Sequence, residues 1–433
     1  MATGEIGPML GIPVTFKDNI HWKGLQLSNG SKIMGKYVAQ YNATVVQRLL
    51  DAGAVPVAKT NMDEFAMGSS GEYSAFGPTR NPWNLEKTPG GSSSGSAVSV
   101  AAEYAPFALG SDTGGSVRLP GCFCNVTAFR PTYGVLSRYG VTAMASSLDQ
   151  VGPMGSSAQA VAAGFGIMAG IDKMDSNSIE LPAIERLFDL RPTKLKGLRI
   201  GLPKEYFMTN IEPDVRKVIE SALLMLRSQG SELVEISLPH TSYAIDTYYL
   251  INTAESYSNL AQFDGVRYGD RKSGETVSEM INQTRSQGFG QEVKRRILLG
   301  AFCLSKVNYD AFYMKAVKTR SLITKDFQEA FKSVDVIATP VSPTSTFPLG
   351  DKISDPMSMY LSDIFTVTPS LASLPAISIP AGFVNDMPVG LQLIGRSLED
   401  VKLLELACAF QKITDHHLRT PKTNFAPLVK LRH

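Results

Sequence analysis

The sequence has no long apolar segment and almost no net charge. No apolar run approaches the roughly 18–20 residues that a membrane-spanning helix requires, and the 433 residues carry a formal net charge of only +2. The first absence argues against a membrane protein. The second provides no general electrostatic attraction to nucleic acid. With 43% apolar and 19% charged residues, the composition is that of an ordinary globular protein.

Cysteine and histidine are also scarce, at four and five residues. Cys122 and Cys124 form the only close pair, and a C-x-C pair is not a zinc site without partners elsewhere. We therefore expect no metal site, and we expect four reduced thiols in an intracellular compartment. The first ten residues, MATGEIGPML, show neither a signal-peptide core nor an Arg-rich amphipathic pattern. The chain therefore either needs no presequence or has lost one.

The common phosphate-binding motifs G-x-x-x-x-G-K-[ST] and G-x-G-x-x-G are missing as well. Their absence argues against a nucleotide-binding protein, and we expect no cofactor in this chain. Glycine itself is plentiful, at 37 residues. It gathers with serine in two stretches, TPGGSSSGSA at 88–97 and LGSDTGGSVRLPG at 109–121. Such stretches are usually tight turns, so a catalytic role is indicated only by the residues around them.

The apolar segments predict an α/β fold. Strand and helix patterns alternate in the first part, with a helix at 43–53, a short buried strand at 54–59, a small-residue helix at 97–105 and a strand at 106–110. Strands return late, at 334–341, 376–383 and 389–395, before a closing helix at 399–414. Pairing of late with early strands would give one mixed sheet covered by helices.

We expect one domain over residues 1–433. Its core would comprise about 1–205 and 335–420. The more helical segment at about 206–334 would form an insertion or cap. The last residues, KTNFAPLVKLRH, are expected to be loose.

Ser116 is the candidate nucleophile, because it directly follows Thr113, Gly114 and Gly115. Successive backbone N–H groups without bulky side chains can converge on a developing oxyanion. A serine needs a base, and no histidine lies in a comparable stretch. Lys17, in GIPVTFKDNI, follows an apolar strand-like run and is expected to be partly buried. Burial disfavours the ammonium, and a neutral amine can accept a proton.

GIPVTFKDNI, TPGGSSSGSA and GSDTGGSVRLPG together resemble the amidase signature family. The resemblance implies the amidase-signature fold, with a mixed central sheet, and a Ser–cis-Ser–Lys triad. The family's lysine falls on Lys17, its bridging cis-serine on Ser92 and its nucleophile on Ser116, with the family's spacing. The oxyanion would sit on the N–H groups around Thr113–Ser116.

Longer segments, including TNMDEFAMGSSGEYSAFGPTRNPWN and GFGQEVKRRILLGAF, are similar to the A subunits of glutamyl-tRNA(Gln) amidotransferases. That family hydrolyses glutamine and passes ammonia to a partner subunit, which amidates glutamyl-tRNA using ATP. The implied partners are a tRNA-binding B subunit, where ATP and Mg are expected, and a small third subunit. The family's glutamine pocket falls on Tyr248, Arg296 and Asp363. Without the resemblance, Tyr248 would be interpreted as a packing residue and Arg296 as a solvated charge on a helix. Asp363 would be interpreted as the cap of a helix that starts at Ile364.

The sequence also departs from the family. Ser94 stands where G-G-S-S-G-G has a glycine, which would add strain if the position needs a positive φ. The segment GCFCNVTAFRPTYG is unusual beside bacterial members. These departures favour the mitochondrial matrix over the bacterial cytoplasm.

Two alternatives to the glutaminase stay open. The first is a stand-alone amidase of small or fatty amides, which would need an apolar pocket in place of Arg296 and Asp363. The second is a non-catalytic scaffold, against which the complete triad argues.

Overall fold

The computed structural model describes residues 7–208 and 210–422. Its centre is a sheet of ten strands in the order β2-β1-β3-β5-β4-β9-β10-β8-β6-β7. The strand bounds are β1 Pro13–Lys17, β2 Val55–Thr60, β3 Phe107–Asp112, β4 Thr127–Arg130, β5 Gln150–Gly155, β6 Arg199–Pro203, β7 Glu232–Ile236, β8 Val336–Pro340, β9 Ala376–Val384 and β10 Met387–Ile394.

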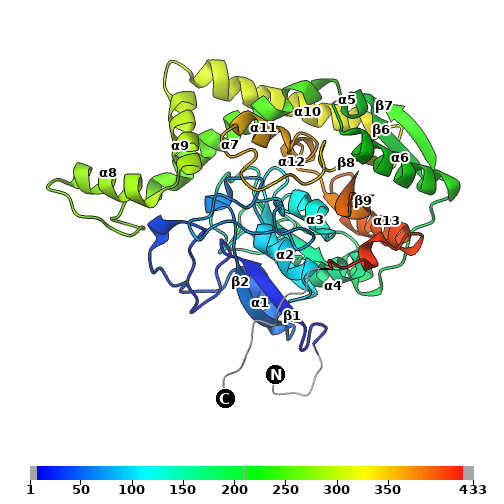
Figure 1. The fold of residues 1–433 in the computed structure, drawn as a ribbon, viewed down its shortest axis with the longest axis horizontal. Coiled ribbons are helices and arrows are strands. Elements are labelled where there is room, and N and C mark those ends of the chain that lie inside the picture. Colours follow the sequence, from blue (N-terminus) through cyan, green and yellow to red (C-terminus); the bar gives the residue numbers. More distant parts are fainter. Residues whose placement is uncertain (1–6, 209, 423–433) are drawn as a thin grey trace.

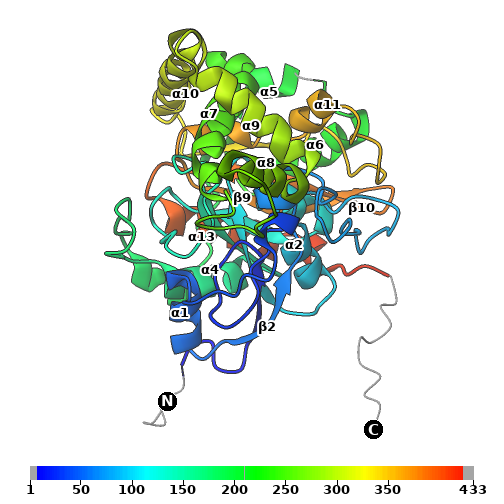
Figure 2. The same cartoon turned by 90° about the vertical axis from the view of Figure 1, so that its left-hand side faces the viewer.

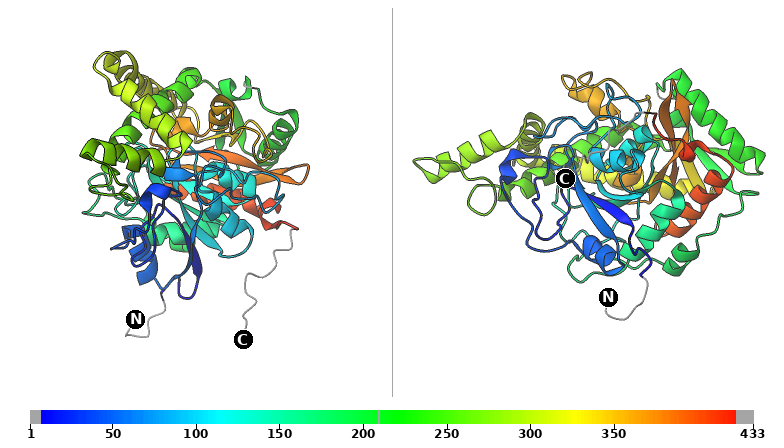
Figure 3. Two further views of the ribbon diagram at one scale, coloured as in Figure 1. Left: turned by 60° about the vertical axis from the view of Figure 1, so that its left-hand side comes forward. Right: turned by 60° about the horizontal axis from the view of Figure 1, so that its bottom comes forward.

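The sheet is mixed, as the sequence predicts. Strand β1 runs parallel to β2 and β3, whereas β5 is antiparallel to β3 and β4. The antiparallel pair β4–β9 joins the N-terminal and C-terminal parts of the chain, with Phe129 opposite Ile377. Figure 3 shows the blue strands of the N-terminal part at one end of the sheet and the green strands β6 and β7 at the other.

Helices cover both faces of the sheet, which confirms the predicted layering. Ala108 of β3 faces α2 (Ser94–Ala101) and α3 (Arg118–Cys124), and its neighbour Phe107 faces Gly164 of α4 (Ala158–Met168) on the other side. The remaining helices near the sheet are α1 (Thr44–Asp51), α5 (Lys204–Met208), α6 (Pro213–Ser228) and α13 (Asp400–Lys412). Small side chains in α2, and Gly121 in α3, allow these helices to approach the sheet closely.

A layer of helices lies above the sheet in the view of Figure 2. In Figure 1, α8 and α9 project beyond the sheet. The helices of this layer are α7 (Ala244–Asn259), α8 (Val277–Gly288), α9 (Gln291–Leu304), α10 (Lys315–Ala330), α11 (Pro356–Leu361) and α12 (Val367–Leu371). Within the segment 206–334, expected as a more helical insertion or cap, strand β7 pairs with β6 at the sheet edge.

Two local expectations are wrong. Strand β2 is an edge strand with Val55 and Val57 about half exposed, because β1 pairs with only one of its sides. Helix α2 begins at Ser94, within the Gly/Ser-rich stretch, and ends at Ala101. Ser94 lies in this helix and has no positive φ, so it carries none of the strain considered for it. The expected loose tail lies outside the described residues from 423 onward.

All four cysteines are buried free thiols. Among residues 7–208 and 210–422, no three His, Cys, Asp or Glu side chains gather closely enough to hold a metal ion. No helix of this described part has both the length and the apolar character needed to cross a membrane.

Candidate active site

Lys17 is the last residue of β1, and its side chain is fully buried. Its Nζ lies 2.7 Å from Ser92 Oγ, 2.9 Å from Ser111 Oγ and 3.2 Å from the Ser111 carbonyl oxygen. Burial lowers the pKa of Lys17 to about 7, against the opposing effect of nearby carboxylates. A substantial fraction of this amine is therefore neutral at neutral pH and can accept a proton.

Ser92 lies in the loop that leads into α2, and it is also fully buried. The peptide bond between Gly91 and Ser92 is cis. A Cβ on Gly91 would come within 2.0 Å of Asp63 Oδ2 and 2.8 Å of the Gly71 nitrogen, so only glycine fits beside Ser92. The loop is also tied down by the Asp63 N–H, which donates to the Ser92 carbonyl at 3.3 Å. The hydroxyl next to Lys17 is thus fixed in place by its backbone.

The two Gly/Ser-rich stretches meet in space. Ser93 donates its backbone N–H to the Ser116 carbonyl at 3.0 Å. The Ser93 hydroxyl also donates to the Ser111 carbonyl at 3.2 Å. Ser116 follows β3 and lies just before the start of α3, and at 8% exposed it is the least buried of the three predicted triad residues. The structure therefore places the candidate nucleophile in a loop bonded to the residue next to Ser92.

The loop Thr113–Gly115 is packed so tightly that it has no room for side chains at its glycines. A Cβ on Gly114 would come within 2.5 Å of Tyr248 Cζ, and a Cβ on Gly115, whose φ is 148°, within 2.2 Å of Thr366 Oγ1. Within the part of the chain that the structure describes, the backbone N–H groups of Gly114, Gly115 and Ser116 donate no hydrogen bond. These groups are therefore available to an oxyanion.

Asp149 anchors the first residue of this loop. The Thr113 hydroxyl donates to Asp149 Oδ1 at 2.7 Å, and Oδ2 accepts from the backbone N–H groups of Met144 and Ala145 at 2.8 and 3.0 Å. Burial raises the pKa of Asp149 to about 6 in spite of these three donors. Asp149 also lines a cavity of about 190 Å³ on the side of Arg138.

Arg296 of α9 is buried, which corrects the alternative of a solvated helix charge. Its Nε donates to Glu292 Oε1 at 2.8 Å and its Nη1 to Asn252 Oδ1 at 3.2 Å. The guanidinium also lies over the rings of Tyr249 and Tyr360, 5.2 and 5.6 Å from their centroids. These contacts hold it in one orientation and leave several of its five N–H donors for another group.

Asn252 connects Arg296 to Tyr248. Its Nδ2 donates to the Tyr248 hydroxyl at 3.3 Å, while its Oδ1 accepts from Arg296. Because the Tyr248 ring lies against Gly114, the chain of contacts runs from the buried arginine to the loop that carries Ser116. Tyr248 and Asn252 share one face of α7, being four residues apart.

Asp363 lies in the turn between α11 and α12, and its side chain caps neither helix. Its Oδ2 accepts from the Ser69 hydroxyl, and its Oδ1 lies 3.3 Å from where a Cβ on Gly115 would be. Burial raises the pKa of Asp363 to about 7, with a further contribution from Asp112. The structure thus brings Tyr248 and Asp363 to the same glycine loop, with Arg296 joined to it through Asn252.

Sequence reasoning missed several residues of the site, most visibly Asp112. Its carboxylate receives two hydrogen bonds from Arg118, at 2.9 and 3.0 Å, and one from Arg130 at 3.2 Å. Burial alone would raise the pKa of Asp112, but the two arginines outweigh it and hold the pKa well below its usual range. Its position in GSDTGGS, four residues before Ser116, was the available signal. Asn19, Ser111, Asp149, Asn252 and Glu292 were also missed.

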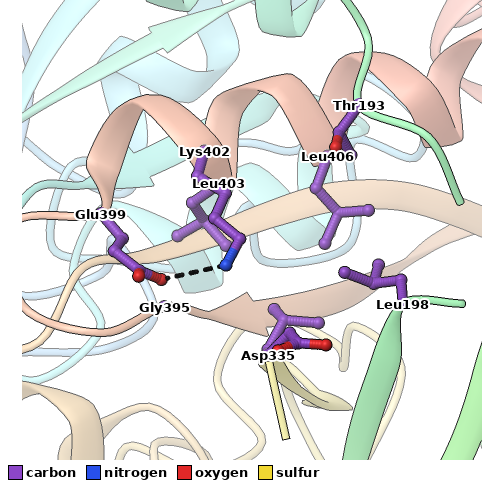
Figure 4. Close-up of a pocket in the computed structure, with 9 residues that line it drawn as sticks. Thr193, Leu198, Asp335, Gly395, Glu399, Lys402, Leu403 and Leu406 are labelled. Atoms are coloured by element: carbon purple, nitrogen blue, oxygen red, sulfur yellow. Dashed lines mark hydrogen bonds and ion pairs between the residues drawn. The ribbon is translucent and has the colours of Figure 1, made fainter. Parts of the chain in front are cut away.

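A second cavity lies away from these residues. It is lined by α13, by Val336 at the start of β8 and by Leu198 just before β6. The ion pair of Lys402 with Glu399 lies beside it (Figure 4). Its volume is about 10 Å³, barely enough for one water molecule. None of the candidate-site residues lines it, so we assign it no role in the chemistry.

Comparison with known proteins identifies the family. The chain belongs to the amidase family, whose sequence model matches residues 1–404. It is 52% identical over 424 residues to the A subunit of the glutamyl-tRNA(Gln) amidotransferase of Carboxydothermus hydrogenoformans, covering 98% of this chain and 87% of that protein. It is also 52% identical to the corresponding protein of Geobacter metallireducens, covering 96% and 86%.

Solved structures show the same fold. The crystal structure of the A subunit of the glutamyl-tRNA(Gln) amidotransferase of Thermotoga maritima superposes with a TM-score of 0.80 at 42% identity, covering 93% of this chain and 83% of that one. An allophanate hydrolase of Kluyveromyces lactis superposes with a TM-score of 0.78 at 28% identity, covering 93% and 62%. The fold is therefore shared by proteins named as an amidotransferase subunit and as an allophanate hydrolase.

Proposed function

We propose that this chain is the glutaminase subunit of a glutamyl-tRNA(Gln) amidotransferase and hydrolyses glutamine through Ser116, Ser92 and Lys17. The observation that carries the chemistry is the buried Lys17 amine, 2.7 Å from Ser92 Oγ. The observation that carries the choice of reaction is the 52% identity to proteins named as the A subunit of this amidotransferase.

The proton moves along the triad in this mechanism. Neutral Lys17 takes a proton from Ser92 as Ser92 takes one from Ser116, and Ser116 Oγ attacks the carboxamide carbon. The resulting oxyanion binds the backbone N–H groups around Thr113–Ser116, among them those of Thr113, Gly114 and Gly115. The protonated lysine returns its proton through Ser92 to the leaving nitrogen, and ammonia departs. Water then cleaves the ester by the same route, releasing glutamate and restoring Ser116.

Glutamine would be recognised by its two charged groups. Arg296 presents its remaining N–H donors to the α-carboxylate, which a guanidinium can bind bidentately. Asp363, beside the glycine loop, receives the α-ammonium, whose positive charge favours the ionised carboxyl. Tyr248 forms the wall between these groups and Gly114. Buried charges of both signs suit an amino acid better than a fatty amide.

The names of the same relatives support a division of the reaction between subunits. We propose that a tRNA-binding B subunit, together with a small third subunit, receives the ammonia and uses ATP and Mg to convert glutamyl-tRNA(Gln) into glutaminyl-tRNA(Gln). Contact with tRNA would be made mainly by that partner. The mitochondrial matrix remains the predicted compartment, with the bacterial cytoplasm as the alternative.

The test is purification of the assembled complex from the source cell, followed by assays of glutamine hydrolysis and of tRNA amidation. Ser116→Ala should abolish amidation driven by glutamine and leave amidation driven by added ammonium chloride intact. Hydrolysis of fatty amides but not of glutamine by the complex would instead support the stand-alone amidase. Loss of both amidation reactions in Ser116→Ala would contradict a role confined to ammonia production.

A further inference from the structure

Two buried polar side chains, Ser111 and Asn19, form a chain of hydrogen bonds that ends at the Lys17 amine. Ser111 lies in β3, and Asn19 follows Lys17 by two residues at the end of β1. Ser111 supplies two of the three oxygens around Nζ, its hydroxyl at 2.9 Å and its carbonyl at 3.2 Å. Asn19 Nδ2 in turn donates to Ser111 Oγ at 2.9 Å. Both side chains are at most 3% exposed.

We propose that Asn19 and Ser111 are positioning residues that hold the Lys17 amine against Ser92 and share the positive charge it acquires during the reaction. The proposal rests on the proposed role of Lys17 as the base. It goes beyond the triad, because Ser111 acts on the reaction through the Lys17 amine, which it contacts, and Asn19 acts through Ser111.

The count of hydrogen bonds supports this role. An ammonium group has three N–H donors, and the three oxygens around Nζ are Ser92 Oγ, Ser111 Oγ and the Ser111 carbonyl. The amine can therefore receive a proton without leaving any N–H unsatisfied in a buried site, where an unpaired donor would cost free energy. The carbonyl can only accept, which fixes one N–H and limits rotation of the amine. Ser111 thus directs the amine toward Ser92.

Asn19 acts one bond further out. Its side-chain amide donates to the Ser111 hydroxyl, which also contacts Lys17. Asn19 itself is held by its backbone carbonyl, which accepts from the Thr142 N–H at 2.9 Å. Being neutral, it orients Ser111 without adding charge near the amine. A carboxylate at the same place would lie within two hydrogen bonds of Nζ and would favour the protonated lysine.

Three carboxylates already act on Lys17 from other elements, namely Asp63, Asp112 and Asp149. Arg118 and Arg130 pair with Asp112 and keep it ionised. The pKa values of Asp63 and Asp149 are raised by burial to about 6, below that of Lys17. The pKa of Lys17 is therefore close to neutral pH. A negative charge added at position 19, or a hydroxyl oxygen removed at position 111, changes the fraction of neutral amine in this range.

The experiment measures the pH dependence of Ser116 reactivity with phenylmethylsulfonyl fluoride, a serine-directed reagent, in the assembled complex. We expect Asn19→Asp to move the acidic limb of this profile up by about one pH unit. We expect Ser111→Ala to move it down, because the ammonium loses an acceptor, and to lower the plateau about tenfold or more. Ser111→Thr keeps the hydroxyl and should restore the wild-type limb.

The outcomes separate this proposal from the proposed function. If Asn19 and Ser111 had only a structural role, Asn19→Asp and Ser111→Ala would both lower the maximal reactivity of Ser116. They would not move the acidic limb of the pH profile in opposite directions, and that result would overturn the positioning role. If the reagent shows the expected shifts but the complex does not hydrolyse glutamine, the positioning role of Asn19 and Ser111 is supported and the glutaminase assignment is rejected. Should Asn19→Asp not fold, the comparison of Ser111→Ala with Ser111→Thr decides alone.

Discussion

The ring of Tyr248 lies against Gly114 so closely that a Cβ on Gly114 would be 2.5 Å from Cζ and 2.7 Å from the hydroxyl oxygen. One residue comes from α7 and the other from the loop after β3. The contact makes the position of the candidate oxyanion loop depend on the helix that also carries Asn252, the partner of Arg296. The proposed glutamine pocket and the proposed oxyanion hole therefore share a wall.

Gly114→Ala should lower kcat/KM for glutamine by about 100-fold or more, because the added methyl group must displace either the loop or the ring. The measurement is steady-state glutaminase kinetics, with thermal unfolding to show that the fold survives. In a double-mutant cycle, Gly114→Ala with Tyr248→Ala should show less than the summed effect, since the clash is gone. Fully additive effects would contradict the contact as the cause.

Lys17→Ala and Ser92→Ala should each lower kcat by about 10³-fold or more while leaving the fold intact, because each interrupts the proton path. Ser96→Ala is the matched control. Ser96 is equally buried and bonded, to Thr60 Oγ1 and the Leu109 carbonyl, but lies one turn along α2. Near-wild-type turnover in Lys17→Ala, or an equal loss in Ser96→Ala, would reject the triad.

Arg296→Lys should raise KM for glutamine about tenfold or more, since an ammonium cannot reproduce the planar fork held by Glu292 and Asn252. Arg295→Lys provides the control on the same helix. Arg295 also pairs with Glu292, but its side chain is 40% exposed. An unchanged KM in Arg296→Lys would show that the α-carboxylate binds elsewhere.

The acidic limb of kcat/KM should lie near pH 7 and be steeper than a single titration allows. Two groups of the free enzyme, Lys17 and Asp363, have pKa values of about 7, and both must lose a proton before they can act as base and as ammonium partner. Activity therefore rises as pH passes through this value. Asp363→Asn should raise KM and reduce the slope of the limb from two protons to one. A slope of one proton in the wild type would contradict the requirement that both Lys17 and Asp363 lose a proton.

Lys17 should also make stability depend on pH. Burial lowers its pKa from 10.5 to about 7, so in this range the unfolded chain binds the proton and the folded chain does not. Wild-type stability should therefore rise with pH, by about 2 kcal/mol between pH 7 and pH 9 from this group. Lys17→Met lacks this contribution. Chemical denaturation at both pH values measures the difference, and parallel pH dependence of the two proteins would show that Lys17 is not buried as an amine.

Local sequence patterns predicted most of the elements, because spacing of apolar residues is a property of each segment alone. The helix at 43–53 and the strand at 106–110 correspond to α1 and β3, and the late strands correspond to β8, β9 and β10. The burial of β2 was mispredicted, because exposure depends on which strand pairs beside it. The start of α2 was placed too late, since serines gave no clear helical signal.

The sequence by itself determined which residues belong to the family's three motifs, because those motifs are short and their spacing is fixed along the chain. Only the tertiary structure decided that the Lys17 amine is fully buried and forms hydrogen bonds with Ser92 and Ser111. It likewise decided that Tyr248 packs on Gly114. It also decided that Arg296 is a buried charge held by Glu292 and Asn252. Most of these relationships join segments that are distant along the chain, and burial and approach between such segments follow from how the sheet and the helical layer pack together.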